Sequence, residues 1–188
     1  MCITMKRTIV IGDLHGCRDP FLRLLAKIDP VPGRDRFIFL GDYVNRGPHS
    51  KELLTELILL KKKMPHTTFL KGNHEFMLLD YLQGRRKDLF FSAGGATTIR
   101  SYDADLTAHT ALKSDHPSPH RRFLDNLLRY WQDVTFIYVN AGLEPGRHRS
   151  HPRPAWLSWL DREILVNKQS KILKQQIFLH FSQILIFF

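Results

Sequence analysis

Three short apolar runs along the chain each end in a glycine followed by a carboxylate or amide side chain. They read TIVIGDLHG at residues 8–16, FIFLGDYVNRG at residues 37–47 and FLKGNHE at residues 69–75. Runs rich in β-branched and aromatic residues predict buried strands, and glycine permits a sharp turn after each of them. We therefore expect three strands that bring polar side chains to one edge of a sheet.

Amphipathic segments separate these strands. Residues 19–28 carry apolar side chains at helical spacing, with Asp19 as the expected N-cap and Pro20 at the first helical position. A second helical pattern covers residues 51–62, and a third opens at Asn73 and runs to about residue 82. This alternation of strands and helices predicts an α/β fold.

The later half of the chain has a weaker pattern. Gly94 and Gly95 predict a tight turn, and residues 111–120, which include two prolines, predict a loop. Apolar side chains within residues 120–132 recur at helical spacing, which predicts a helix there. Residues 135–139 predict a fourth strand that ends at Asn140.

Length and composition indicate one globular unit. With 188 residues and 43% apolar side chains, the chain can build a real core, so we expect residues 1–188 to form a single domain. The two cysteines imply no disulfide framework. The chain shows no signal-peptide pattern and no apolar stretch of membrane-spanning length, so we expect a cytoplasmic protein without a membrane partner. The formal net charge of +10 favours anionic partners.

The polar residues at the strand ends suit divalent cations. Asp13 and His15 lie two positions apart in an extended segment, so both side chains can face the same way. Asp42 could bridge two ions, and Asn73 could offer its amide oxygen to the second. Carboxylate, amide and imidazole ligands together fit a pair of manganese, iron or zinc ions.

Two further side chains fit the chemistry of a phosphate ester. Arg46 could grip phosphate oxygens with its two-pronged guanidinium. His74 is placed to protonate a leaving oxygen. Each of these residues alone would more simply be a turn or cap residue, and the combination of three strand ends carries the interpretation.

The three segments resemble the GDxHG, GDxVDRG and GNHE signatures of the calcineurin-like metallophosphoesterases, and within them the bacterial and phage branch of the serine/threonine protein phosphatases. The resemblance runs from about residue 8 to about residue 165 and includes GGATTIRSYD and VNAGLEPG, which leaves residues 166–188 as an atypical tail. It implies a β-sandwich flanked by helices. It also implies hydrolysis of phosphate esters by metal-activated hydroxide.

The resemblance also implies a role for each matching position. Two divalent cations are expected, most readily manganese, with iron or zinc as alternatives. The implied metal ligands are Asp13, His15, Asp42, Asn73 and, as a weak ligand, Asn140.

The remaining positions bind and protonate the substrate by the same resemblance. Arg46, Asn73 and Lys71 would bind the phosphate of the substrate, and Arg46 would also be a catalytic residue. His74 would be the general acid, with Asn45 as its catalytic partner.

Three departures from the family pattern predict weakened activity. Asn45 stands where the family has an aspartate that pairs with the catalytic histidine, so the negative charge is lost and leaving-group protonation is expected to suffer. Asn140 stands where the family has a histidine. The late GH motif is absent, and His180 in the tail is better interpreted as a core residue than as a ligand. We therefore expect a weak second metal site, and a truncated or altered end that lacks the last strands of the fold.

The substrate stays open at this point. The first hypothesis is a phosphatase acting on phosphoserine, phosphothreonine or another small phosphate ester. One alternative is a symmetrical dinucleoside-tetraphosphate hydrolase acting on a nucleotide, since that branch shares the motifs, and another is a catalytically impaired relative. Specific nucleic-acid binding is not expected, because no recognised binding module is present.

Overall fold

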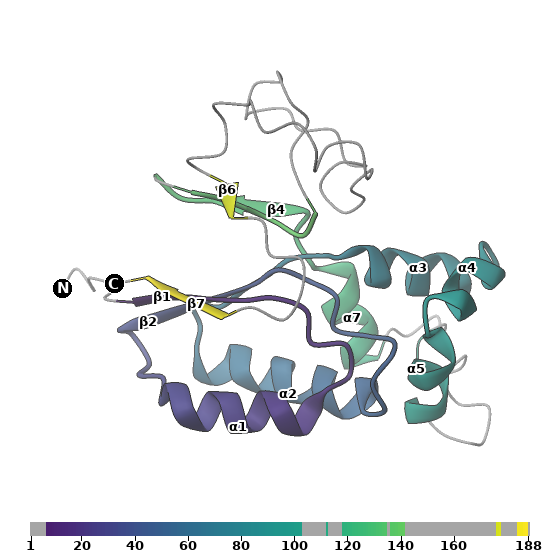
Figure 1. Ribbon diagram of the computed structural model, residues 1–188, viewed down its shortest axis with the longest axis horizontal. Helices are drawn as coiled ribbons and strands as arrows, with labels where there is room; N and C mark the ends of the chain where they lie inside the picture. Colours follow the sequence, from purple (N-terminus) through teal and green to yellow (C-terminus); the bar gives the residue numbers. More distant parts are fainter. Residues whose placement is uncertain are drawn as a thin grey trace.

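The computed structural model describes residues 7–102, 112, 118–134, 136–141, 176–177 and 184–187 (Figure 1). These residues form two sheets with helices along one face and at one end. Among them, no helix has the length and apolar character needed to span a membrane.

The larger sheet carries the first three strands predicted from the sequence, and the strand predicted at residues 135–139 lies in the second sheet as β5 (Ile137–Val139). The order of the larger sheet is β3-β2-β1-β7, with β1 at Arg7–Ile11, β2 at Asp35–Phe39, β3 at Thr68–Phe69 and β7 at Ile184–Phe187. The first three strands are parallel, and β7 runs antiparallel to β1 along its free side. This strand comes from the segment that the sequence analysis treated as an atypical tail.

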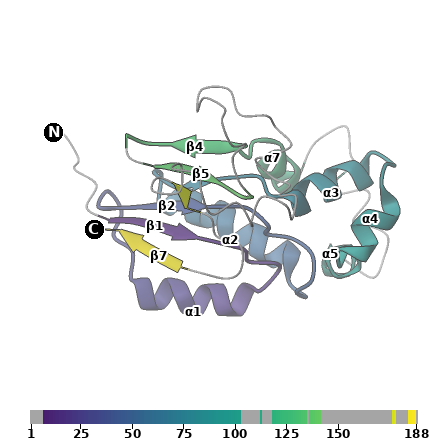
Figure 2. The same ribbon diagram turned by 45° about the horizontal axis from the view of Figure 1, so that its top comes forward.

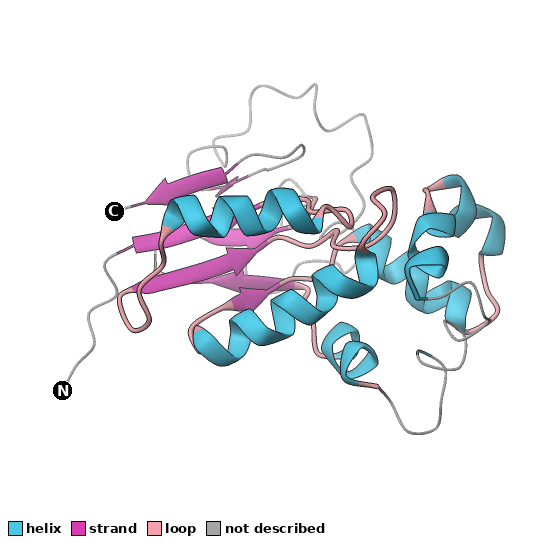
Figure 3. Cartoon of the chain, turned by 90° about the horizontal axis from the view of Figure 1, so that it is seen from below, coloured by secondary structure: helices cyan, strands magenta, loops and turns pink. Residues whose placement is uncertain are grey.

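Successive side chains along β1 and β2 point to opposite faces of the larger sheet, so the core is divided into two clusters. Ile9 and Phe37 are fully buried in the layer that includes α1 (Arg18–Ile28) and α2 (Ser50–Lys63). Their neighbours Val10 and Ile38 face the opposite way and pack in a second cluster with Tyr138. Figure 3 shows α1 and α2 lying side by side across one face of the larger sheet, the face to which Ile9 and Phe37 contribute.

The second sheet covers the other face. It contains β4 (Tyr130–Gln132), β5 (Ile137–Val139) and β6 (Gln176–Ile177), with β4 antiparallel and β6 parallel to β5. Figure 2 shows this sheet stacked over the first, on the side away from α1 and α2. The predicted β-sandwich flanked by helices is confirmed.

Four shorter helices gather at the end of the sandwich where the parallel strands finish (Figure 1). They are α3 (Asn73–Leu82), α4 (Lys87–Ser92), α5 (Gly95–Tyr102) and α7 (Pro119–Asp125). The rings of Tyr81 and Phe90 stack at 4.5 Å and join α3 to α4. The sequence pattern predicted α3 correctly but gave no sign of α4 or α5.

Two predicted helix boundaries are wrong. The first helix starts at Arg18, with Cys17 at the N-cap, so Asp19 lies in the first turn instead of capping it. The helix expected over residues 120–132 ends at Asp125, because residues 130–132 pair with β5 and form β4. Apolar spacing fits either structure there, and the pairing with β5 decides between them.

The loop predicted over residues 111–120 is wrong at its last two residues, because α7 begins at Pro119, and residues 111 and 113–117 lie outside the described residues. His120 belongs to α7, where its Nδ1 lies 2.9 Å from the hydroxyl of Tyr102. His180 and the segment between Ala141 and β6 lie outside the described residues.

Candidate metal and phosphate site

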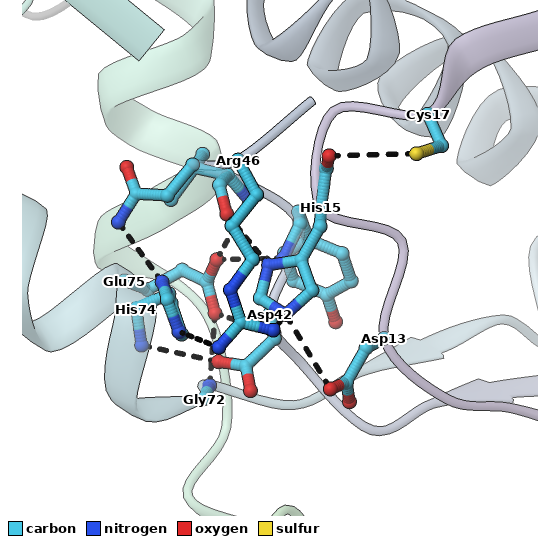
Figure 4. A network of polar contacts seen from close by, with 11 residues as sticks. Asp13, His15, Cys17, Asp42, Arg46, Gly72, His74 and Glu75 are labelled. Atoms are coloured by element: carbon cyan, nitrogen blue, oxygen red, sulfur yellow. Dashed lines mark hydrogen bonds and ion pairs between the residues drawn. The ribbon is translucent and has the colours of Figure 1, made fainter. Parts of the chain in front are cut away.

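The parallel strands β1, β2 and β3 end at the same edge of the larger sheet, and the site lies just beyond that edge. The loops that follow carry Asp13, Asp42 and Asn73, from segments far apart in the sequence. The carboxyl ends of parallel strands are where side chains from separate loops converge in α/β folds. Figure 4 shows the side chains of Asp13, His15 and Asp42 converging with those of Arg46 and His74.

The loops hold an unusual backbone conformation. Four residues other than glycine have positive φ: His15 at 41°, Asp42 at 56°, Asn45 at 71° and Arg46 at 67°. Such angles are uncommon outside glycine and persist only where surrounding contacts enforce them. These four backbone conformations therefore lower the stability of the fold, and in return they orient the four side chains.

Glycines allow the second and third loops to touch. A Cβ added at Gly72 would overlap the carboxylate of Asp42 and stand 2.6 Å from Asp42 N. Gly41 has φ of 114°, and a Cβ there would stand 2.5 Å from Gly72 N. Any larger residue at either position would push apart the loops that carry Asp42 and Asn73.

The carboxylate of Glu75 accepts hydrogen bonds from both of these loops and so holds them together. Its Oε2 accepts hydrogen bonds from Asp42 N at 2.8 Å and Gly72 N at 2.9 Å, and its Oε1 accepts from Tyr43 N at 2.8 Å and Val44 N at 3.3 Å. Complete burial and the nearby Asp42 raise the pKa of Glu75 to about 7, against the opposing effect of the N–H donors. The sequence patterns did not single out Glu75 as a site residue, although an acid three residues after the N-cap Gly72 stands where a capping box has its glutamate, and its Oε2 accepts from Gly72 N.

A potential metal-binding group occupies the middle of the site. His15, Asp42 and His74 each offer a ligand atom, and these atoms lie within 4.8 Å of one another. Asp13 adjoins them, with Oδ2 3.5 Å from His15 Nε2. Within the described part of the chain, Asp13 Oδ1 is buried without a hydrogen-bond partner. A buried carboxylate oxygen without a donor is costly, and a bound cation would satisfy it, so these residues fit a divalent metal.

His15 is oriented as a metal-binding imidazole. Its Nδ1 donates to the carbonyl oxygen of Val44 at 3.0 Å, which leaves the lone pair of Nε2 facing the site. An outer hydrogen bond of this kind fixes the tautomer of many ligating histidines. Burial lowers the pKa of His15, but the Asp13 carboxylate, the Val44 carbonyl and Asp42 outweigh it, so the pKa is raised.

Asp42 is the buried centre of the charge cluster. Burial and the neighbouring Asp13 raise its pKa, while the backbone N–H of His74 and the side chain of Asn140 bind its carboxylate and lower it. Two carboxylates this close repel each other unless a cation lies between them.

Arg46 spans the two imidazoles. Its Nη1 donates to His15 Nε2 at 2.9 Å, and its Nη2 lies 3.4 Å from His74 Nε2. The guanidinium thus stands beside the metal-binding group, where phosphate oxygens could replace the imidazoles as its partners.

The other predicted site residues occupy different surroundings. Asn45 is fully buried, with Nδ2 3.0 Å from His74 Nδ1. Asn140 is buried after β5 and hydrogen-bonds the Asp42 carboxylate. Asn73 opens α3. The ammonium of Lys71 lies 5.5 Å from the centre of the Phe76 ring, and burial lowers its pKa.

Comparison with known proteins gives a consistent set of relatives. The sequence matches the profile of the calcineurin-like phosphoesterases over residues 6–163. It is 46% identical over 77 residues to a symmetrical bis(5'-nucleosyl)-tetraphosphatase of Acidovorax ebreus, covering 41% of this chain and 26% of that protein. It is 39% identical over 97 residues to the serine/threonine-protein phosphatase SIT4 of Candida albicans, covering 50% of this chain and 31% of that protein.

A solved structure agrees on the fold. A crystal structure described as that of a putative diadenosine tetraphosphatase superposes with a TM-score of 0.56 at 24% identity, over 80% of this chain and 56% of the other. At this identity the likeness concerns the fold alone. The chain spans less than half the length of the curated relatives it matches.

Proposed function

The chain belongs to the calcineurin-like phosphoesterase family, and from this premise we propose that it hydrolyses phosphate esters with the help of divalent cations. The observation that carries the proposal is the meeting of three loops at one point. There the ligand atoms of His15 and Asp42 lie within 4.8 Å of each other and of a ring nitrogen of His74, beside a buried carboxylate oxygen of Asp13 and the guanidinium of Arg46.

Asp13, His15 and Asp42 would hold the first ion, with Asp42 and Asn73 sharing the second. We expect manganese, with iron or zinc as alternatives, because the donor set mixes carboxylate, imidazole and amide. When bound, such ions activate a water molecule and neutralise charge on the phosphoryl group. The second ion would be held weakly, because Asn140 supplies an amide that already hydrogen-bonds Asp42.

The side chains around the ions divide the remaining work. Arg46 would turn its two N–H groups from the imidazoles to the phosphate oxygens, as charge-assisted hydrogen bonds. Asn73 and Lys71 would add further contacts, and Lys71 would add positive charge. His74 would donate a proton from Nε2 to the leaving oxygen, while Asn45 holds Nδ1 at 3.0 Å.

The substrate class we place first is a phosphorylated protein, at phosphoserine or phosphothreonine, or another small monoester. A nucleotide substrate of the dinucleoside-tetraphosphate kind is the second candidate, since relatives of both classes are similar to this chain. The basic composition, with a net charge of +10, suits either anion.

Hydrolysis of an aryl phosphate with added Mn²⁺ tests the proposal. We expect turnover by the full chain, a clear loss in His74→Ala, and no change in His66→Ala, which removes an exposed imidazole. Turnover unaffected by His74→Ala would contradict the role given to His74. Parallel assays on a phosphoserine peptide and on diadenosine tetraphosphate would separate the two substrate classes.

A further inference from the structure

A groove runs along α2, with α7 and β3 as its other walls, and we call it the α2–α7 groove. Its larger part is a hollow of about 720 Å³ lined by α2, by residues 67–69, by α7 and by the segment that follows α7. A second hollow of about 570 Å³ continues it toward α5 and shares Ile58, Lys62 and Pro119 with the first. The described residues that line the groove include none of those assigned to the metal and phosphate site.

The floor of the α2–α7 groove is apolar. Phe69, Phe123 and Leu127 line the first hollow, and the rings of Phe69 and Phe123 meet edge to face at 5.0 Å. Leu128 on the wall of this hollow is 45% exposed, and Leu59 in the second hollow is 43% exposed. Exposed apolar side chains that gather around a hollow, with polar residues at its rim, are typical of a binding groove.

The rim of the groove is positively charged. Lys61 and Lys62 in the last turn of α2 line the first hollow together with Arg122 of α7. The ammonium of Lys61 is held in place by the carbonyl oxygens of Pro65 at 2.9 Å and Thr67 at 2.6 Å. Neither hollow has a carboxylate among its described lining residues. The groove therefore presents cations above an apolar floor.

We propose that the α2–α7 groove binds an acidic segment of a partner protein, whose apolar side chains enter the two hollows. Glutamate or aspartate side chains beside these anchors would meet the cations of the rim, which gives charge complementarity. The hollows together follow α2 from Lys51 to Lys62, which is roughly 16 Å at 1.5 Å per residue. This length suits a peptide segment, and an amphipathic segment in an apolar groove is a common mode of recognition.

Two other occupants match the groove less well. In a symmetric pair of chains the same patch meets itself, so the cations of the rim would repel each other. The net charge of +10 opposes such self-association further. An anionic membrane takes up apolar side chains that protrude, whereas Phe69 and Leu127 lie inside the hollow and are only 8% and 7% exposed. A protein segment can reach these two residues.

Fluorescence anisotropy with the full chain tests the proposal. The probe is a fluorescein-labelled synthetic peptide of repeated Glu-Glu-Leu-Leu units. We expect the probe to bind, with an affinity that falls as salt screens the charges. Replacing its leucines with serine, or its glutamates with lysine, should abolish binding. A probe that does not bind would overturn the proposal, as would equal binding of the serine peptide, because charge alone would then account for it.

Two substitutions in the groove locate the binding. Leu128→Asp replaces an anchor contact with a negative charge and should weaken probe binding by about tenfold or more. Lys62→Glu reverses a charge on the rim and should weaken it by a smaller factor, because charges at a rim contribute less. The matched controls are Leu89→Asp and Lys87→Glu, which make the same changes at exposed positions of α4 outside the groove and should bind the probe as the wild type does.

The remaining outcomes contradict the proposal. Equal binding in the wild type and all variants, or equal losses in the groove and control variants, would show that the probe binds elsewhere. Wild-type binding to phosphatidylserine vesicles that disappears in Lys62→Glu, without binding of the probe, would assign the groove to a membrane. A dimer in sedimentation velocity that dissociates in Leu128→Asp would assign it to a second copy of the chain. Should Leu128→Asp fail to fold by circular dichroism, Lys62→Glu, at an exposed position, decides the probe test.

This proposal does not depend on the proposed function. Probe binding is measured without turnover, so it gives its answer whether or not the chain hydrolyses phosphate esters.

Discussion

The four hydrogen bonds that the Glu75 carboxylate accepts from backbone N–H groups form a clamp between two loops of the site. Removing part of this clamp tests how the site is assembled. Glu75→Gln keeps the size of the side chain but replaces one acceptor oxygen with an N–H₂ group. That group must then face two backbone N–H donors, either those of Asp42 and Gly72 or those of Tyr43 and Val44. Donor would meet donor in a place with no access to water.

The magnitude follows from the number of bonds lost. A hydrogen bond to a charged group contributes about 1.5–3 kcal/mol, so losing two costs about 3–6 kcal/mol. Burial raises the pKa of Glu75 to about 7, which shows that part of this gain is offset by desolvation, so we expect the lower end, about 3 kcal/mol. Domains of this size are stable by about 5–15 kcal/mol, so the loss should be plain.

Urea unfolding followed by circular dichroism would measure the change in the free energy of unfolding. Glu52→Gln is the matched control, because Glu52 is an exposed residue in the first turn of α2. The same variants titrated with Mn²⁺ should show weaker binding for Glu75→Gln alone, since the loop carrying Asp42 is no longer held. If Glu75→Gln unfolds within about 0.5 kcal/mol of the control, as ordinary surface substitutions do, the clamp is not what holds the loops.

Three further outcomes are expected. Arg7 donates to Asp35 and lowers the pKa of that carboxyl below its unfolded-state value of 3.8. The Asp35 carboxylate therefore stabilises the fold above pH 3.8, and this stabilisation is lost as the pH falls through the lower folded-state pKa. Arg7→Gln should reduce this acid-side loss of stability in unfolding curves measured as a function of pH. Gly72→Ala should weaken Mn²⁺ binding in calorimetry, because a Cβ there overlaps the Asp42 carboxylate, and unchanged affinity would show that the loops have room to spare. Asn45→Asp restores an acceptor for a proton on His74 Nδ1 and should raise alkyl phosphate hydrolysis by about tenfold or more, whereas an unchanged rate would show that the anion is not what limits protonation.

The strand ends could be predicted from the sequence because they depend on short segments. An apolar run followed by Gly-Asp or Gly-Asn is a local pattern, and this pattern alone is enough to place Asp13, Asp42 and Asn73 at one sheet edge. Parallel pairing of β1, β2 and β3 brings these residues to the same place in the fold.

The supporting residues could not be predicted in the same way. Thr98 reaches Asn45 across 53 positions, and Glu75 reaches Asp42 across 33, so neither contact leaves a local trace. The prediction for residues 130–132 failed for a related reason, since their apolar spacing suits a helix and only pairing with β5 makes them a strand. Long-range hydrogen bonds and pairing decide these positions, and a local pattern carries no information about either.

The positive φ angles of His15 and Arg46 are a third feature without a local signal. The sequence places His15 and Arg46 at positions where the backbone has a positive φ, a conformation that glycine adopts without strain. Hydrogen bonds from distant loops, such as Gly47 N to His15 O at 2.9 Å and Arg46 N to Gly94 O at 3.2 Å, hold those conformations.

The central claim is that separate loops build one cation site, and equilibrium dialysis against Mn²⁺ tests it most directly. Asp88→Asn, which neutralises an exposed carboxylate on α4, is the matched control for Asp42→Asn. We predict at least one manganese ion per chain in the wild type and in Asp88→Asn, and loss of that ion in Asp42→Asn. Equal manganese content in all three proteins would contradict the claim.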